Sequence, residues 1–444
     1  MTPPLASPLP SQIGKYRVLR LLGEGATSEV FLCVDDFNAR EVAVKRVRAG
    51  ALSDVSEGAL QARFFAAEAA LVGRLQHPNV VQIFDAVADP SEPYVVMEYV
   101  PGTTLRPYCR ADHLLPLDQI VEIGFKCAMA LGYVSRQGLI HRDVKPANLL
   151  AVTVGNDITE VKVSDFGSVL NLHADTTQVF RVGSLAYMSP EQLDGDALDP
   201  RADIYSLGAV LYHLIAGRQP FDATAQSVLM AQIYGAKPAP LTELRAGVDP
   251  ALDAVIQRAL AKQPGDHYAG WDDFAQAISA LVANRQVPRG GRQNVLDSER
   301  FNLLRTLEFF SLFGDVQLWE VVHRATWQRY PQGHLIYRKG EEGNTFHIIA
   351  AGSVDVHRDG VRVAHLGAGT SVGEMVYLAP NPELKRHSTD VAVVEPATMI
   401  SFTPESLAHL SPGSRHLFDE AFIRVLVRRL HVAHEALAYP RRIL

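Results

Sequence analysis

Hydrophobic and polar residues alternate along residues 16–48, where Val, Leu and Phe recur at every second position between turn residues. This period of two predicts β-strands, because successive side chains of a strand point to opposite faces. Residues 56–75 change to a helical spacing, with Phe64, Leu71 and Leu75 on one face. Two further strand-like runs, HPNVVQIFDAV and PYVVMEYV, follow. The first hundred residues therefore predict a strand-rich part that carries one helix.

The pattern becomes mainly helical from about residue 118, as in DQIVEIGFKCAMALGYVSRQG. Gly138 is a suitable end for this helix, since glycine accepts the left-handed conformation that closes many helices. A strand-rich part followed by a helix-rich part predicts two lobes.

A second part of the chain follows a polar segment, residues 284–299, which contains a proline and two adjacent glycines and which we interpret as a linker. After a helical stretch at about 301–326, glycines interrupt short β-branched runs from residue 333 onward. Short strands separated by regular turns favour a β-roll or barrel. Residues 415–438 then form the pattern of an amphipathic helix.

The composition is that of a globular protein: of 444 residues, 47% are hydrophobic and 20% are charged, with a formal net charge of −7. No stretch concentrates Lys and Arg, so we expect no nucleic-acid partner. No apolar run is long enough for a membrane span, and we interpret residues 1–15 as a disordered, proline-rich leader. The three cysteines (Cys33, Cys109 and Cys127) form no paired pattern, which favours free thiols and a reducing, cytoplasmic location.

Gly23 and Gly25 lie between two predicted strands in LGEGATSEVFL, where backbone amides could approach a phosphate closely. A plain hairpin turn explains the same glycines. Lys45 lies on a strand with alternating apolar neighbours, which also describes an ordinary surface lysine. Glu68 falls on the apolar stripe of its helix, where a carboxylate needs a partner. We interpret Lys45 as that partner; the alternative is a partly exposed edge of the stripe.

The segment HRDVKPANLL carries the densest chemistry of the chain, with Asp143, Lys145 and Asn148 within six residues. A carboxylate can accept a hydroxyl proton, a lysine can neutralise a phosphoryl group in transfer, and an asparagine carbonyl can ligate a hard cation. In VKVSDFGS, Asp165 follows a strand and offers a second oxygen ligand. Each residue alone fits a solvated loop, but their combination in this order indicates phosphoryl transfer.

Residues 16–283 resemble the Hanks-type (eukaryotic-like) protein kinases through HRDVKPAN, SDFG, SPEQL and DIYSLG. The resemblance implies Asp143 as catalytic base, Lys145 on the γ-phosphate, and Asn148 and Asp165 on Mg²⁺ or Mn²⁺. Lysine at position 145 resembles the serine/threonine branch, so the expected partners are ATP and protein substrates. The implied ATP-binding residues, including a gatekeeper methionine and the hinge after it, are Gly23, Gly25, Val30, Ala43, Lys45, Glu68, Met97, Glu98 and Val100.

The activation segment of such a kinase is expected at NLHADTTQVFRVGS. A phosphate on Thr176 or Thr177 could dock on Arg142, beside the expected base, whereas Ser184 is expected to bond the catalytic loop. The alternative is a flexible polar loop without a phosphate.

The sequence departs from the family pattern in two places. His267 stands where the family usually has an arginine paired to Glu191, so this contact would be weaker or would depend on protonation. Ser28 stands where a third glycine is common. Neither change removes a chemical group, so a pseudokinase is the less favoured interpretation.

Residues 300–437 resemble the cyclic-nucleotide-binding fold of catabolite-activator-like regulators and cyclic-nucleotide-dependent kinases, through LGAGTSVGEM and DVAVVEPATMISF. The resemblance implies that Gly373 and Glu374 bind the ribose of cAMP or cGMP. An arginine is expected on the cyclic phosphate, but that position falls on His387, with Arg386 one residue early and Ser388 as a third candidate. A one-residue shift on a strand turns a side chain to the other face. A degenerate pocket that serves protein contacts is therefore the alternative.

The sequence predicts an α+β chain: a bilobal kinase fold, with a β-rich small lobe and a helical large lobe, and then a cyclic-nucleotide-binding-type β-roll with flanking helices. The predicted function is a serine/threonine protein kinase regulated by the C-terminal module; the alternative is a pseudokinase scaffold. The predicted domains are a leader at 1–15, a kinase domain at 16–283, a linker at 284–299 and the C-terminal module at 300–437.

Overall fold

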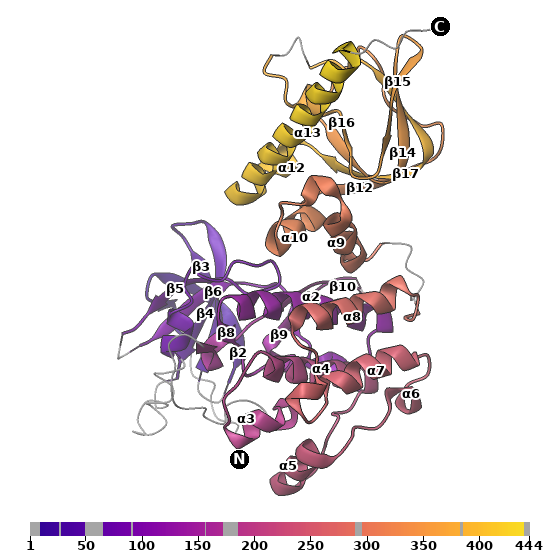
Figure 1. The fold of residues 1–444 in the computed structure, drawn as a ribbon. Coiled ribbons are helices and arrows are strands. Elements are labelled where there is room, and N and C mark those ends of the chain that lie inside the picture. The colour runs from indigo at the N-terminus through magenta and orange to yellow at the C-terminus, as the bar shows by residue number, and fades with distance from the viewer. Residues whose placement is uncertain are drawn as a thin grey trace. The chain divides into compact units, whose positions relative to one another are not determined.

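The chain forms two compact units, residues 1–294 and 295–444, which we describe one at a time (Figure 1). The first unit has a small strand-rich lobe and a larger helical lobe, and the second is a β-sheet with flanking helices, which confirms the predicted α+β class. The computed structural model describes residues 9–25, 28–48, 65–89, 92–155, 157–171, 185–288, 295–381 and 385–438.

The small lobe of the first unit is an antiparallel sheet with the strand order β1-β2-β3-β4-β6-β5. Successive side chains of β3 and β4 point to opposite faces of this sheet. One face therefore carries a hydrophobic core that includes Phe31, Cys33, Val42 and Val44. The strands are β1 (Gln12–Ile13), β2 (Tyr16–Glu24), β3 (Ser28–Asp35), β4 (Arg40–Val47), β5 (Ile83–Val87) and β6 (Tyr94–Glu98).

The opposite face of the same sheet carries four of the predicted ATP-binding residues. In the register of the strands, Val30 lies across from Lys45, and Ala43 lies across from Met97. Ala43 and Lys45 are two residues apart on β4, so their side chains point the same way. The strand pairing therefore gathers Val30, Ala43, Lys45 and Met97 on one surface.

The large lobe is built around two helices that are buried along most of their length, α2 (Leu117–Arg136) and α4 (Arg201–Ala216). Gly138 follows α2 with a φ of 74°, as expected for the residue that ends a helix. The other α-helices of this lobe are α3 (Pro190–Asp194), α5 (Gln226–Gly235), α6 (Leu241–Leu244), α7 (Pro250–Ala259) and α8 (Trp271–Ala283).

Short strands and 3₁₀ turns connect these helices and carry the loops of the candidate site. Strand β9 pairs with both β7 and β10, and β8 pairs with β11. The strands are β7 (Thr103–Thr104), β8 (Leu139–Ile140), β9 (Leu149–Val154), β10 (Asp157–Val163) and β11 (Leu170–Asn171). The 3₁₀ turns are η1 (Arg106–Cys109), η2 (Pro146–Asn148), η3 (Phe166–Ser168), η4 (Leu185–Tyr187) and η5 (Pro264–Asp266).

The second unit is a six-stranded sheet in which β17 and β14 are the central strands, with β12 and β15 outside them. Strand β13 also pairs with β17, and β16 with β14. The strands are β12 (Thr326–Tyr330), β13 (Leu335–Tyr337), β14 (Phe346–Arg358), β15 (Val361–Gly367), β16 (Ser371–Val372) and β17 (Asp390–Phe402). The helices are α9 (Asp297–Thr306), η6 (Glu308–Phe310), α10 (Asp315–Arg324), α11 (Glu374–Tyr377), α12 (Pro404–Ala408) and α13 (Pro412–Ala438).

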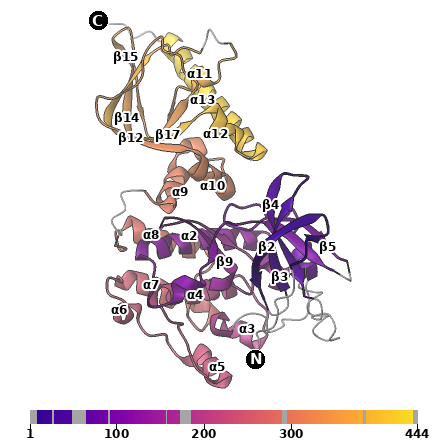
Figure 2. The ribbon, with the colours of Figure 1, turned by 180° about the vertical axis from the view of Figure 1, so that it is seen from behind.

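Helix α13 lies beside the strands of the second unit in both views (Figures 1 and 2). Phe418 of α13 packs on Phe402 of β17, and Phe422 packs on Phe346 of β14, each with 4.9 Å between ring centroids. This aromatic cluster fixes the first half of α13 against the sheet.

Two predicted helices differ from those in the structure. Within the expected helix at 56–75, the described part is helical only at 65–69 and continues as turns, while Phe64 lies outside the described residues. The helical stretch expected at 301–326 is α9, η6 and α10, interrupted before Gly314. Thr326 begins β12, because the aromatic and β-branched run TWQRY pairs with β17.

In the part of the chain that the structure describes, no helix is both long and apolar enough to span a membrane. Cys33, Cys109 and Cys127 are buried and free. The cytoplasmic location stays a prediction.

Candidate active site

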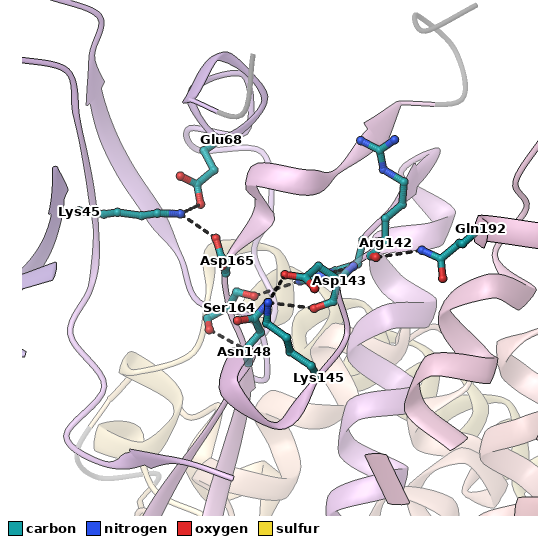
Figure 3. A network of polar contacts seen from close by, with 10 residues as sticks. Lys45, Glu68, Arg142, Asp143, Lys145, Asn148, Ser164, Asp165 and Gln192 are labelled. Carbon is teal, nitrogen blue, oxygen red and sulfur yellow. Dashed lines mark hydrogen bonds and ion pairs between the residues drawn. The ribbon is translucent and has the colours of Figure 1, made fainter. Parts of the chain in front are cut away.

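Lys45 on β4 is held by two carboxylates from different parts of the first unit (Figure 3). Its Nζ lies 2.8 Å from Oε1 of Glu68, in the helical segment 65–69, and 2.6 Å from Oδ1 of Asp165. Burial by itself would lower the pKa of Lys45, but the two carboxylates outweigh burial and raise the pKa above its ordinary value. Burial works to raise the pKa of Asp165, but Lys45 lowers it to about 2. Lys45 and Asp165 are therefore both charged near neutral pH.

Lys145 and Asn148 converge on the carboxylate of Asp143 (Figure 3). Nζ of Lys145 lies 2.6 Å from Oδ2 of Asp143, and Nδ2 of Asn148 donates to the same oxygen at 3.0 Å. Asn148 also donates to the backbone carbonyl of Asp143 at 2.8 Å. The turn η2 begins at Pro146, whose missing N–H costs nothing at the start of a helical turn. This turn brings the three side chains together.

Ser164 joins this loop to the segment that carries Asp165, although the sequence analysis did not single it out. Its backbone N and its Oγ both donate to the carbonyl of Asn148 at 2.9 Å. Nε2 of His141 lies 3.0 Å from the carbonyl of Ser164. The two motifs are thus one hydrogen-bonded structure, which the spacing along the chain does not reveal.

Asp203 at the start of α4 anchors the backbone before Asp143. Its carboxylate accepts the N–H groups of His141 at 2.7 Å and Arg142 at 2.8 Å, and the residue is buried. Nε2 of Gln192 donates to the carbonyl of Arg142 at 2.9 Å (Figure 3). Arg142 has a φ of 66°, in the left-handed region that non-glycine residues rarely adopt. These contacts offset that backbone strain at the site.

The remaining predicted nucleotide-binding residues lie around the same sheet. Gly23 and Gly25 are exposed at the β2–β3 turn, and the N–H of Gly25 donates to Ser28 at 2.7 Å. The Glu98 carboxylate pairs with Lys162 at 2.8 Å, and its backbone N–H donates to the carbonyl of Gln82 at 2.8 Å. Val100 is buried.

The predicted phosphorylation sites Thr176 and Thr177, and also Ser184, lie outside the described residues. Arg142, the expected docking cation, donates from its guanidinium to the backbone carbonyls of Ser168 and Val169. A docking phosphate would have to replace or share these contacts.

His267 does not take the place of the arginine that the sequence analysis expected to pair with Glu191. Its Nε2 donates to the carbonyl of Ala261 at 2.6 Å, and its Nδ1 is buried without a partner. Burial lowers the pKa of His267, so the ring is neutral near pH 7. The described part of the chain contains no ion pair between His267 and Glu191, because the ring is turned toward the end of α7.

In the second unit, Glu374 begins α11 directly after Gly373, and only 1% of the residue is exposed. Its Oε1 pairs with Arg429 of α13, and Arg429 also donates to the carbonyl of Ser371 at 2.7 Å. Oε2 of Glu374 is buried without a partner. Arg429 cannot be recognised from the sequence, because it lies 55 positions from Glu374 and the helix pattern alone does not mark this arginine.

The three candidates for a cyclic phosphate lie differently from one another. Arg386 is exposed and pairs with Glu342, while Ser388 is exposed as well. His387 is buried and stacks on Tyr337, with 3.9 Å between ring centroids. The neighbouring side chains thus point to opposite faces, as the strand argument predicts, and the arginine is on the outer one.

These contacts bring together the two acidic motifs, around Asp143 and Asp165, that protein kinases use for phosphoryl transfer. The profile of the family described as protein kinase domain matches residues 16–269, more than half of the chain, and the chain belongs to this family. The profile of the cyclic nucleotide-binding domain matches residues 327–411 in the second unit. Both resemblances expected from the sequence are confirmed.

Several curated bacterial proteins are similar to this chain. It is 39% identical to the serine/threonine-protein kinase PknB of Mycobacterium leprae over 262 residues, which are 57% of this chain and 41% of the relative. It is 39% identical to PknB of Mycolicibacterium smegmatis over 300 residues, 65% of this chain and 46% of the relative. It is 33% identical to a probable serine/threonine-protein kinase of Clostridium acetobutylicum over 273 residues, 61% and 40% of the two chains. The chain thus spans less than half the length of these relatives.

Proposed function

We propose that this chain is a serine/threonine protein kinase, which transfers the γ-phosphate of ATP to hydroxyl groups of proteins. The observation that carries the proposal is a pair of charged groups in the two lobes: Lys45 with Glu68 and Asp165, and Asp143 with Lys145. The names of the bacterial relatives support the serine/threonine class.

Each side chain has a role that its position permits. Asp143 accepts the proton of the substrate hydroxyl, because Lys145 and Asn148 both bind Oδ2 and hold the carboxylate in one orientation. Lys45 binds the α- and β-phosphates from the sheet face that carries Val30, Ala43 and Met97. Lys145 stabilises the charge of the phosphoryl group in transfer.

Asn148 and Asp165 would hold Mg²⁺ or Mn²⁺. No cluster of three or more His, Cys, Asp or Glu residues in the described ranges forms a metal site. Two protein oxygen ligands beside a phosphate site are nevertheless enough for magnesium, because water and phosphate oxygens of the substrate supply its other ligands. Nδ2 of Asn148 is used in both hydrogen bonds to Asp143, so Oδ1 would be the atom that holds the metal. The metal would neutralise phosphate charge during transfer.

Two substitutions test the transfer activity. Asp143→Asn keeps the shape of the loop but removes the proton acceptor, so phosphate transfer to protein falls by about 10²- to 10⁴-fold. Asp165→Ala removes a carboxylate ligand and abolishes metal-dependent turnover. Transfer is measured with radiolabelled ATP in Mg²⁺ and in Mn²⁺, and Asp196→Asn, at an exposed position of the large lobe, is the control.

A pseudokinase gives a different result. The wild-type protein then shows no transfer with either metal, and Asp165→Ala binds ATP as well as the wild type does. That outcome would favour the scaffold function.

For the second unit we propose a regulatory role in which Glu374 binds α13 through Arg429 rather than a cyclic nucleotide. Oε2 of Glu374 has no partner and could accept a hydrogen bond from a ribose hydroxyl. Of the three candidates for the cyclic phosphate, the arginine, Arg386, is exposed and pairs with Glu342, and only His387 is buried. Burial lowers the pKa of His387, so it is a poor substitute at neutral pH. The residues therefore fit the ribose and do not fit the cyclic phosphate.

Calorimetry with cAMP and cGMP at about pH 5.8 and about pH 7.8 tests this proposal, and we expect no binding heat at either pH. Arg429→Gln destabilises the second unit by roughly 1 to 3 kcal/mol, since it leaves a buried carboxylate without its charged partner. Arg428→Gln is the matched control, because its pair with Glu308 is exposed on both sides. Tight nucleotide binding by the wild-type protein, or equal stability of the two variants, would contradict the proposal.

A further inference from the structure

A hollow of about 770 Å³ lies on the large lobe beside the catalytic loop. Arg106 of the turn η1 and Arg110, which follows this turn, line one side of the hollow. The catalytic loop contributes Lys145 and Ala147, and η4 contributes Tyr187. Lys45 and Asp165 do not line this hollow, so it is distinct from the nucleotide face of the sheet.

This hollow lies next to the predicted proton acceptor, Asp143, through Lys145. Nζ of Lys145, on its wall, lies 2.6 Å from Oδ2 of Asp143. A polypeptide that presents a hydroxyl to Asp143 therefore places its neighbouring side chains in this hollow.

The charge of the lining is positive. Among the described residues that line the hollow, none is a carboxylate, whereas Arg106, Arg110 and Lys145 carry positive charge. Arg106 is exposed and has no ion-pair partner among the described residues. Arg110 forms an ion pair with Asp112, which lies outside the hollow, at 2.7 Å. Lys145 forms an ion pair with Asp143.

Two other residues of the lining, Ala147 and His213, add neither negative nor positive charge to the hollow at neutral pH. Ala147 occupies a catalytic-loop position that offers no acid to a basic substrate. Burial lowers the pKa of His213, so the ring adds no positive charge at neutral pH and pairs instead with the hydroxyl of Tyr187 at 2.8 Å. Arg106 is thus the most available charge in the hollow.

We infer that this hollow binds acidic polypeptide segments, and that Arg106, with Arg110, selects substrates with Asp or Glu near the phosphorylated residue. The inference rests on the proposed kinase function and adds the substrate class. Guanidinium groups suit this task, because they bind carboxylates through two parallel hydrogen bonds.

Three synthetic peptides test this selection with the full-length protein. Each has one threonine, flanked by alanine and glycine, by glutamate, or by lysine. We expect kcat/KM for the glutamate peptide to exceed that for the lysine peptide by about tenfold or more at low salt, mainly through KM, and the ratio to shrink as salt rises.

Charge reversal identifies the residues responsible. Arg106→Glu lowers the glutamate-to-lysine ratio by about fivefold, and the double variant with Arg110→Glu inverts the preference. Lys237→Glu, an exposed cation that does not line the hollow, leaves the ratio unchanged. Activity on the alanine–glycine peptide shows that each variant is folded.

The outcomes separate this inference from the kinase proposal. Transfer to all three peptides at equal efficiency, or a preference for lysine, overturns the acidic-substrate inference and leaves the kinase function standing. An unchanged ratio in the double variant overturns the assignment to Arg106 and Arg110. If no peptide and no protein is phosphorylated by the wild type, the kinase proposal itself fails.

Discussion

His347 on β14 is buried in the second unit, and its Nδ1 lies 2.7 Å from Oγ of Ser401. Tyr337 stacks between this ring and His387, with 5.4 Å to the former and 3.9 Å to the latter. Burial, reinforced by the charge that His387 would carry, lowers the pKa of His347 to about 4. Protonation of this ring is therefore unfavourable in the folded state.

The pKa shift predicts an acid-sensitive second unit. A histidine in the unfolded chain has a pKa of about 6.5. Below that pH the unfolded chain therefore binds a proton, whereas His347 in the folded protein stays neutral until the pH is much lower. The stability contributed by neutral His347 is complete above about pH 6.5 and is lost as pH falls toward about 4, by roughly 3 kcal/mol at most.

His347→Gln, which keeps a hydrogen-bonding group for Ser401, should flatten this pH dependence. Thermal unfolding of the second unit between about pH 4.5 and pH 7 measures it, and His409→Gln at an exposed position is the control. If the wild type and His347→Gln lose stability in parallel, the buried ring is not the source.

At the scale of elements, glycines shape the strands of the second unit. Gly352 lies where the β14–β17 register shifts, with a φ of 83°, and a Cβ there would meet the Pro396 carbonyl at 2.4 Å. Gly360 lies in the tight turn between β14 and β15, with a φ of 80°, and a Cβ there would meet nothing within 4 Å. Both glycines have a left-handed backbone conformation, but only Gly352 lacks the space for a Cβ atom.

This contrast predicts different costs for the same substitution. Gly360→Ala pays only for the left-handed backbone, about 1 to 2 kcal/mol. Gly352→Ala adds a clash with backbone atoms, so its cost exceeds that of Gly360→Ala by roughly 1 to 3 kcal/mol. Urea unfolding of the two variants measures the difference. Equal midpoints would contradict the prediction and would show that β14 and β17 move apart at position 352 at little cost.

The glycine spacing was enough to predict short strands and turns, and period two was enough to predict the sheet of the small lobe. The interruption before Gly314 was missed, although Gly314 before Asp315 is a local signal for the start of a helix. The motifs predicted Asp143, Lys145 and Asn148 together, since they are neighbours in sequence. Ser164 and Arg429 were missed, because their roles come from contacts between distant segments.

At the scale of the whole molecule, the chain consists of two units with separate hydrophobic cores. We predict two thermal transitions in calorimetry. ATP with Mg²⁺ at about 100 times its dissociation constant stabilises the first unit by about 2.7 kcal/mol and leaves the second transition unchanged. Gly352→Ala moves only the second transition. A single transition that responds to both changes would show that the units unfold together.

The Glu374–Arg429 ion pair also bears on how the protein is synthesised. A ribosome adds about 5 to 20 residues each second, so roughly 3 to 11 s separate these two residues, which lie 55 positions apart. During that interval the kinase unit has already been made, whereas the carboxylate of Glu374 has no arginine to receive it. The pair between Glu374 and Arg429 therefore forms only after the kinase unit has been made, and the strands around Glu374 are accessible to chaperones that hold nascent chains during that interval.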